Sequence, residues 1–424
     1  MTMTLASLGP MAGLAVLVAG SAPLEPNYDE SKVPDYVLPD PLTMENGSRV
    51  VEPGQWPARR AEILELFRER VYGHTPAPRD PLECDVRTED GVLGGLATRK
   101  QVTLYPGGRG SGVTLNLLLY VPSAATGPVP AFLGLNFPGN HTVADDPGID
   151  LPTCWVMNDA GMGVTGNRAR EENRGEHAVH WQVKRLLQRG YALATMCYCD
   201  IDPDYDDGFR NGVHPLYHRP GQSAPNPDQW GSIAAWAWGL SRALDYLIAD
   251  PDVDGARVAA MGHSRLGKTA LWAAAEDERF AMAISNDSGC GGAALSMRAF
   301  GETVARINTA FPHWFCANFR QYNDREADLP VDQHELIALI APRPAYVASA
   351  ENDLWADPRG EFLAAKHADP VYRLLGTDGL PCDEMPPVNQ PVHGTIGYHI
   401  RSGDHAILEY DWLQYLDFAD KHLR

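Results

Sequence analysis

Short apolar stretches alternate along this chain with longer segments in which apolar residues recur at helical spacing. The apolar stretches predict strands at 82–100, 101–105, 113–121, 129–137, 191–199, 258–261, 280–285, 343–350 and around 396–399. The helical spacing predicts helices at 56–72, 179–189, 232–248, 335–340 and 408–422. Strands that alternate with helices favour a mostly parallel central sheet with helices on both faces, which is a three-layer α/β sandwich.

Polar segments rich in Gly, Asp and Asn separate several of these elements. Three of them, near 138–178, 200–230 and 290–330, are long for loops inside a compact domain, and loops of that length are usually functional. The stretch between the last two predicted strands is also expected to be a loop. Residues 26–55 are rich in Pro, Asp and Asn and predict an extended arm, which leaves 56–424 as a single domain with insertions.

Residues 1–25 have features of a leader. The apolar run 11–19 is followed by small residues, which resembles the h-region and cleavage site of a secretory signal. However, no Lys or Arg precedes Lys32, so the positive n-region is missing, and a truncated signal or an added leader fits equally well. No apolar run is long enough to span a bilayer.

The excess of acidic residues argues against two classes of binding partner. A formal charge of −20 argues against nucleic acid and anionic membrane, because both need Lys and Arg on the binding face. The seven cysteines are odd in number and spread over 424 residues, which is not a disulfide scaffold. Cys197 and Cys199 lie in an apolar run and are expected in the core, and one or two disulfides elsewhere stay open.

One stretch, 257–272, combines two motifs that bear chemistry. It has the pattern of a short strand, a tight turn and a helix rich in Ala and Leu. Ser264 stands at the turn, and a serine on a sharp strand-to-helix turn is the nucleophile elbow of the α/β-hydrolases. Residues 262–269 also fit the phosphate-binding pattern G-x-x-x-x-G-K-[ST]. A third interpretation is a glycine-containing turn without chemistry.

Residues downstream of the turn favour the elbow. An α/β-hydrolase needs an acid and then a histidine after its serine, in that order. Asp287 and Asp353 end the next two apolar strands, and His405 lies in a turn before the last helix. A phosphate-loop enzyme needs an aspartate for Mg²⁺, which Asp287 could imitate, but its motif usually follows an early strand. The order of residues therefore favours an esterase over an NTPase.

The same residues suggest a mechanism. His405 would take the proton of Ser264 as the hydroxyl attacks an ester carbonyl, while an aspartate orients the imidazole. The backbone N–H of Arg265 would meet the oxyanion, and its guanidinium could add a charge-assisted hydrogen bond. Lys268, one turn later, would bring a second cation. Two cations beside a nucleophile in an acidic protein indicate a polar or anionic acyl group.

Several motifs together resemble one known family, the glucuronoyl esterases of carbohydrate esterase family 15. The resemblance rests on GHSRLGK at 262–268, SNDSGCGGA at 285–293, FPHWF at 311–315, DLWADP at 353–358 and GDH at 403–405, which precedes Asp411-Trp412. It implies an α/β-hydrolase that cleaves esters between lignin alcohols and the 4-O-methyl-D-glucuronic acid of glucuronoxylan, without a metal or cofactor.

The resemblance also implies roles for single residues. Ser264 would be the nucleophile, His405 the base and Arg265 the oxyanion partner, with an acyl-enzyme as intermediate. The positions similar to those that bind the uronic acid hydroxyls are Lys268, Glu302 and Trp355. The long loops resemble insertions of bacterial members that deepen the cleft. The implied partners are glucuronoxylan and lignin-carbohydrate esters, and we expect a secreted or periplasmic monomer.

The chain departs from the family pattern at two places. Fungal members carry a cysteine before the serine, where this chain has His263, which we interpret as a packing residue or a support for the site. The acid after the next strand is usually a glutamate, but here it is Asp287. Asp353 holds the other usual position, so either aspartate, or both, could orient His405.

Alternatives remain for one residue and for the function. An alternative role for Glu302 is an ion pair with Arg298, one turn earlier on a helix. The chain could also be another carbohydrate esterase, such as an acetyl xylan esterase, or a non-catalytic glucuronoxylan-binding protein on the same fold.

Overall fold

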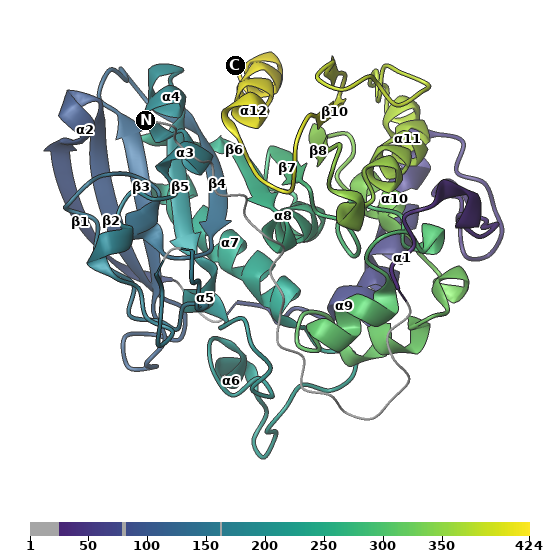
Figure 1. The fold of residues 1–424 in the computed structure, drawn as a ribbon, viewed down its shortest axis with the longest axis horizontal. Helices are drawn as coiled ribbons and strands as arrows, with labels where there is room; N and C mark the ends of the chain where they lie inside the picture. Colours follow the sequence, from purple (N-terminus) through teal and green to yellow (C-terminus); the bar gives the residue numbers. More distant parts are fainter. Residues whose placement is uncertain (1–24, 79–81, 162) are drawn as a thin grey trace, which may run out of the picture.

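The computed structural model describes residues 25–78, 82–161 and 163–424, so the predicted leader falls outside it except for its last residue. The described chain forms one ten-stranded sheet in the order β1-β2-β3-β5-β4-β6-β7-β8-β10-β9 (Figure 1). The strands are β1 (Glu83–Gly91), β2 (Ala97–Tyr105), β3 (Leu115–Pro122), β4 (Val129–Asn136), β5 (Ala192–Cys197), β6 (Val253–His263), β7 (Met282–Asn286), β8 (Ala345–Ala350), β9 (Val392–His393) and β10 (Ile396–Arg401).

Parallel pairing runs through the centre of the sheet. β5, β4, β6, β7, β8 and β10 pair in parallel, whereas β1, β2 and β3 join antiparallel at one edge and β9 joins antiparallel at the other. Because the carboxyl ends of parallel strands lie at one edge, the loops that follow β6, β7, β8 and β10 meet there. The predicted mostly parallel sheet is confirmed.

Two helical layers cover the two faces of the sheet. Leu117 and Leu119 of β3 belong to one hydrophobic core, and Leu118 and Tyr120 to the other, as the alternation of side chains along a strand requires. The first core includes α1 (Trp56–Phe67), α7 (Ser232–Ala249), α8 (Arg265–Glu276), α10 (Gln333–Ala338) and α11 (Pro358–Leu374). The second includes α3 (Ala178–Trp181), α4 (Val183–Gln188) and α12 (Glu409–His422), and Figure 1 shows α12 at the top.

The largest difference from the sequence-based prediction is α11. The segment that contains it was expected to be a loop, and that prediction is wrong. Asp357 caps the helix by accepting a hydrogen bond from the backbone N–H of Gly360 at 2.9 Å, and Pro358 occupies the first turn, where a missing N–H costs little. The helix continues through Pro370 because its apolar face, which includes Phe362 and Tyr372, is buried in the core.

Two elements also end at residues other than those predicted. The strands expected at 82–100 and 101–105 form a hairpin whose turn comes earlier, over the short helix α2 (Val92–Gly95). Gly91 and Gly94 adopt φ values of 71° and 75° there, which glycine accepts without strain. The helix predicted at 56–72 is α-helical to Phe67 and finishes as a π-helical turn, Arg68–Tyr72.

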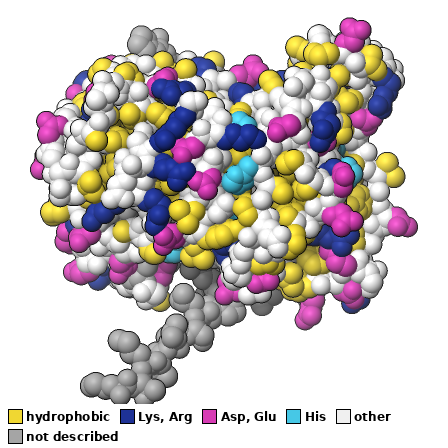
Figure 2. Space-filling view, turned by 90° about the horizontal axis from the view of Figure 1, so that it is seen from above, with side chains coloured by type: hydrophobic (Ala, Val, Ile, Leu, Met, Phe, Trp, Pro, Cys, Tyr) yellow, Lys and Arg dark blue, Asp and Glu magenta, His cyan; other side chains and the backbone are white. Residues whose placement is uncertain are grey.

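The three long insertions remain mostly irregular in the described residues. They contain only short helices, among them α5 (Tyr198–Ile201), which begins at the end of β5, α6 (His214–Tyr217) and α9 (Val304–Ala310). None of the described helices combines the length and apolar character needed to cross a membrane. All seven cysteines are free thiols, and Cys197 and Cys199 are buried, as predicted for core residues. Acidic and basic side chains are interspersed on the face shown in Figure 2.

Candidate active site

Ser264 stands on a strained turn between β6 and α8. Its backbone has φ 58° and ψ −129°, a conformation that costs a non-glycine residue on the order of 1–3 kcal/mol. A Cβ at Gly262 would come within 1.9 Å of the Leu266 carbonyl oxygen, so glycine is required for the helix to start directly beside the strand. The turn therefore has the geometry of a nucleophile elbow.

Lys268 argues against a phosphate loop at this turn. Its ammonium donates to the backbone carbonyls of Ser288 at 2.6 Å and Cys290 at 2.5 Å. The residue is only 3% exposed. A P-loop lysine must reach into the phosphate site, whereas this ammonium already has two carbonyl partners inside the protein.

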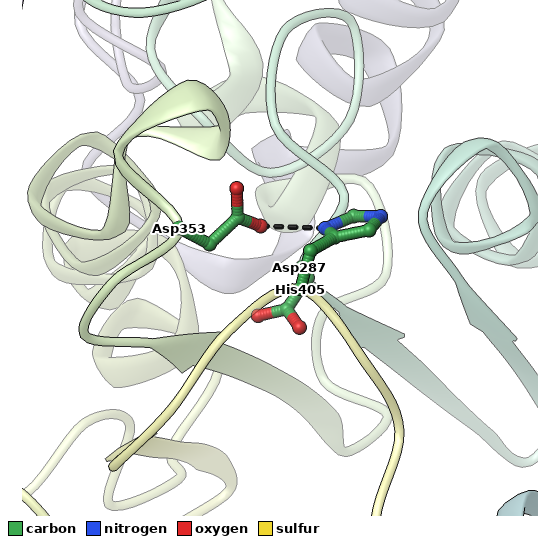
Figure 3. A group of neighbouring side chains, drawn as sticks. All are labelled: Asp287, Asp353 and His405. Carbon is green, nitrogen blue, oxygen red and sulfur yellow. Dashed lines mark hydrogen bonds and ion pairs between the residues drawn. The ribbon is translucent and has the colours of Figure 1, made fainter. Parts of the chain in front are cut away.

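His405 and Asp353 form the hydrogen bond expected of a catalytic pair. His405 Nδ1 lies 2.6 Å from Asp353 Oδ2, and the dashed line in Figure 3 marks this contact. The Asp353 side chain is 5% exposed and the His405 side chain 42%. With its Nδ1 proton directed at the carboxylate, the imidazole keeps Nε2 free to accept the proton of a serine hydroxyl.

Asp287 lies beside this pair, but its carboxylate binds Arg401 and the backbone of Ala406 rather than the imidazole. Its Oδ2 accepts hydrogen bonds from Arg401 Nη2 and from the backbone N–H of Ala406, both at 3.3 Å. Arg401 also donates to the carbonyl oxygens of Asp404 and Ala406, so it and Asp287 shape the turn that carries His405. Burial and then the nearby carboxylates raise the pKa of Asp287 well above its usual range. Of the two candidate acids, the structure brings Asp353 to His405.

The same three side chains lie close enough together to be tested as a metal site. Ligand atoms of Asp287, Asp353 and His405 all lie within 4.8 Å of one another. A metal would need the lone pair of His405 Nδ1, but that nitrogen is occupied by the hydrogen bond to Asp353. Arg401 and the backbone N–H of Ala406 already donate hydrogen bonds to Asp287 Oδ2. The donor set therefore fits proton transfer better than metal binding.

Arg265 is held by an aspartate that the sequence did not single out. Its guanidinium forms an ion pair with Asp204 and lies over the Trp314 ring, 4.7 Å from the centroid. Asp204 also accepts hydrogen bonds from His313 Nε2 at 2.9 Å, Trp314 Nε1 at 2.7 Å and the Tyr198 hydroxyl at 2.8 Å. Burial opposes ionisation, but the Arg265 charge and these donors hold the pKa of Asp204 well below its usual range. Arg265 is thus fixed as a cation beside Ser264.

Lys268, Glu302 and Trp355 come together next to the elbow. Lys268 Nζ lies 3.6 Å from Glu302 Oε2, and both residues are buried. Burial raises the pKa of Glu302, while the charges of Lys268 and Arg265 oppose that rise. The backbone N–H of Glu302 donates to the Trp355 carbonyl at 3.0 Å, and Trp355 is 40% exposed. The group therefore combines the partly exposed Trp355 ring with the buried Lys268–Glu302 ion pair.

The alternative partner for Glu302 is wrong. Arg298 forms an ion pair with Asp357 at 2.7 Å and another with Glu30 at 2.6 Å. The helical turn of Arg298 ends at Ala299, which adopts a left-handed φ of 46°, so residues 298 and 302 do not share one helix. Glu302 is free to face Lys268 instead.

His263 packs against the catalytic imidazole. The centroids of the His263 and His405 rings are 4.5 Å apart, and the ring planes are inclined by 42°. His263 Nδ1 lies 2.6 Å from Asn286 Oδ1, so it donates to the amide oxygen. Burial and then the neighbouring His405 lower the pKa of His263 well below its usual value, which keeps this second imidazole neutral. The residue supports the site, as interpreted from the sequence.

A serine on a strand-to-helix elbow, followed in the chain by an aspartate and its hydrogen-bonded histidine, defines a serine hydrolase of the α/β-hydrolase class. Comparison with known proteins narrows this class. A family model described as glucuronyl esterase of fungi matches residues 224–376. Carbohydrate esterase MZ0003, from an unknown prokaryotic organism, is 51% identical over 94% of this chain and 92% of its own length. This chain therefore belongs to the glucuronoyl esterases, carbohydrate esterase family 15, and is a carboxylic ester hydrolase.

Two further relatives illustrate the range of this family. The solved glucuronoyl esterase from Solibacter usitatus is 48% identical, with a TM-score of 0.88, and the match covers 93% of this chain and 100% of that one. The 4-O-methyl-glucuronoyl methylesterase of Cerrena unicolor is 26% identical, over 87% of this chain and 66% of its own length. The resemblance noted from the sequence motifs is confirmed at the level of the family and the fold.

Proposed function

We propose that this enzyme hydrolyses the ester between the 4-O-methyl-D-glucuronic acid of glucuronoxylan and lignin alcohols, through an acyl-enzyme on Ser264. The observation that carries the proposal is the group beside the nucleophile. The Arg265 cation and the Lys268–Glu302 pair lie together next to the elbow and give it a charged wall, with which a hydrocarbon acyl chain could form no hydrogen bonds. A uronic acid offers hydroxyls and a polarised carbonyl to the same groups. Relatives named glucuronoyl esterase support this choice of substrate.

The first half of the reaction forms the acyl-enzyme. His405 Nε2 accepts the proton of Ser264 while Ser264 Oγ attacks the ester carbonyl. The resulting imidazolium keeps its hydrogen bond to Asp353, whose charge stabilises it. The N–H of Arg265, which has no partner within its own helix, and the Arg265 guanidinium stabilise the oxyanion. His405 then protonates the leaving alcohol as the ester C–O bond breaks.

The second half releases the acid. A water molecule takes the place of the alcohol, gives its proton to His405 Nε2 and attacks the acyl carbonyl. Collapse of the second oxyanion breaks the bond to Ser264 Oγ, which recovers its proton from His405. The product is the free uronic acid, which carries a carboxylate.

Recognition of the sugar is assigned to three residues. Glu302 and Lys268 offer an acceptor and a donor to the ring hydroxyls, and the half-exposed Trp355 ring offers a face for stacking. In the same proposal the partners are glucuronoxylan and lignin-carbohydrate esters, and the enzyme is a secreted or periplasmic monomer.

A comparison of two substrates tests the proposal. The purified enzyme should release glucuronate from benzyl D-glucuronate far faster than it releases acetate from acetylated xylan. A preference for acetylated xylan would favour an acetyl xylan esterase instead. Binding to glucuronoxylan without any ester hydrolysis would favour a non-catalytic protein.

A further inference from the structure

Two thiols face each other beneath one of the long insertions. Cys154 Sγ lies 3.8 Å from Cys197 Sγ. Cys197 is the last residue of β5 and is buried, whereas Cys154 lies in irregular chain within the insertion 138–178 and is partly exposed. Both are free thiols in the structure. The catalytic mechanism uses neither of them.

We propose that Cys154 and Cys197 form a reversible disulfide that fastens the insertion 138–178 to the carboxyl end of β5. The two sulfurs must approach from 3.8 Å to about 2.05 Å. Cys197 is held in register in the sheet, opposite Asn136 of β4, so it acts as the fixed end. Cys154 belongs to no helix or strand and can supply the remaining movement.

A cavity reaches Cys197 and passes Thr153, the residue before Cys154. It has a volume of about 330 Å³, and its walls include Cys197, Thr153, Asn116 and Asp200. In the proposed reaction, a low-molecular-weight disulfide oxidises the two thiols. The partly exposed Cys154 attacks it first, which breaks the S–S bond of the reagent, forms a mixed disulfide and releases one thiol. Cys197 then attacks the Cys154 sulfur and releases the second thiol, so two protein thiols are oxidised and one disulfide is reduced.

The surroundings make the folded pair slow to react. Contact with Cys197, burial and the nearby Asp200 carboxylate all raise the pKa of Cys154, so little thiolate is present at neutral pH. Since the thiolate is the attacking species, the rate of oxidation should increase with pH. Disulfides persist in oxidising compartments, which agrees with the secreted or periplasmic location proposed above.

The bond would lie directly behind the substrate site. The Cys197 thiol contacts the Phe137 carbonyl oxygen at 3.7 Å. The Phe137 ring lies 5.8 Å from the Arg265 guanidinium carbon and 6.4 Å from the His263 ring centroid. The disulfide therefore joins the insertion to the wall that supports the oxyanion side of the site. Because it also closes a loop from 154 to 197 in the unfolded chain, we expect the Tm to increase by roughly 5 °C.

The experiment counts thiols in the full-length enzyme before and after oxidation with oxidised glutathione at pH 8.5. The proposal predicts that seven thiols become five, the intact mass falls by about 2 Da, and peptide mapping joins the peptides that contain Cys154 and Cys197. Dithiothreitol should restore the seven thiols. Seven unreacted thiols, a stable glutathione adduct, or a bond between Cys197 and Cys199 would each overturn the proposal.

Two variants complete the test. Cys154→Ser should abolish both the bond and the Tm increase, while ester hydrolysis continues. Cys199→Ser removes the competing buried thiol, two residues from Cys197, and should leave both effects intact. The peptide map of the unaltered enzyme decides the outcome even if one variant fails to fold. No part of this test depends on which ester the enzyme prefers.

Discussion

His405 Nδ1 lies 2.6 Å from Asp353 Oδ2, whereas the carboxylate of Asp287, one strand away, is bonded to Arg401 and to the backbone of Ala406. The catalytic hydrogen bond therefore joins His405 to Asp353. Asp287 holds the turn that presents the imidazole. This division of roles makes the two aspartates experimentally separable.

Asp353→Asn and Asp287→Asn should differ strongly in their effect on kcat. An asparagine at 353 cannot favour the tautomer with a proton on Nδ1, and the comparable change in serine proteases lowers kcat by about 10⁴-fold. Asp287 has a raised pKa, so a neutral amide of the same shape should lower kcat less than about tenfold. Kinetics on benzyl D-glucuronate, with circular dichroism as a check on folding, measures both. Equal losses would mean that the two carboxylates share the role.

Asp204→Asn should release Arg265 and weaken oxyanion stabilisation. We expect kcat/KM to fall by about 10²-fold, close to the effect of losing one oxyanion donor. Asp206→Asn is the matched control, because Asp206 lies in the same insertion but is exposed, and its carboxylate accepts a hydrogen bond from the nearby Gly208 N–H. If both variants keep full activity, Asp204 does not position Arg265 for catalysis.

Glu302→Ala should separate sugar recognition from ester cleavage. Loss of the carboxylate that faces Lys268 removes an acceptor for sugar hydroxyls but leaves the Ser264–His405–Asp353 group intact. The KM for a glucuronate ester should increase about tenfold or more, a change of at least about 1.4 kcal/mol. Hydrolysis of a simple aryl acetate is the control and should change little. A parallel loss on both substrates would point to a structural role for Glu302.

His263→Phe should preserve more activity than His263→Ala. Phenylalanine keeps an aromatic ring against His405, whereas alanine leaves space beside the catalytic imidazole. The pH profile of kcat/KM should stay close to that of the unaltered enzyme for the phenylalanine variant and move for the alanine variant. Identical profiles for the two variants would show that ring contact does not matter.

The stability of the enzyme should depend on pH through Glu361. Burial raises the pKa of its carboxyl from 4.5 to about 8, although it accepts hydrogen bonds from the backbone N–H groups of Ser288 and Gly289. The folded chain thus binds this proton more tightly than the unfolded chain. The resulting stabilisation is complete below pH 4.5 and is lost as the pH rises through 8.

Glu361→Gln removes this titrating group, so the folded and unfolded chains no longer differ in the proton bound at position 361. Between pH 5 and 8 the slope of the unfolding free energy should become less negative, by at most about 1.4 kcal/mol per pH unit. Denaturant unfolding at several pH values measures the slope. Glu384→Gln, at an exposed site, is the control and should leave it unchanged. An unaltered slope in Glu361→Gln would contradict a proton bound to Glu361 in the folded state.

The sheet, the elbow and the role of His405 could be predicted because each leaves a local pattern in the sequence. These patterns are the apolar stretches, the strand–turn–helix at Ser264, and a histidine in the turn before the last helix. The choice between Asp287 and Asp353 did not follow from sequence, since both end adjacent strands and only the path of the turn after β10 decides which one meets the imidazole. Asp204 was missed because it lies among five aspartates at 200–207, and only the folded insertion distinguishes it. The α11 helix was missed because two prolines obscured a face that becomes apolar core.

The most direct test of the central claim is the turnover of benzyl D-glucuronate by Ser264→Ala. We expect the variant to fold like the unaltered enzyme but to lose roughly 10⁴-fold or more in kcat, because the nucleophile of the mechanism is gone. Turnover within tenfold of the unaltered enzyme would contradict the assignment of Ser264 and, with it, the mechanism built on His405 and Asp353.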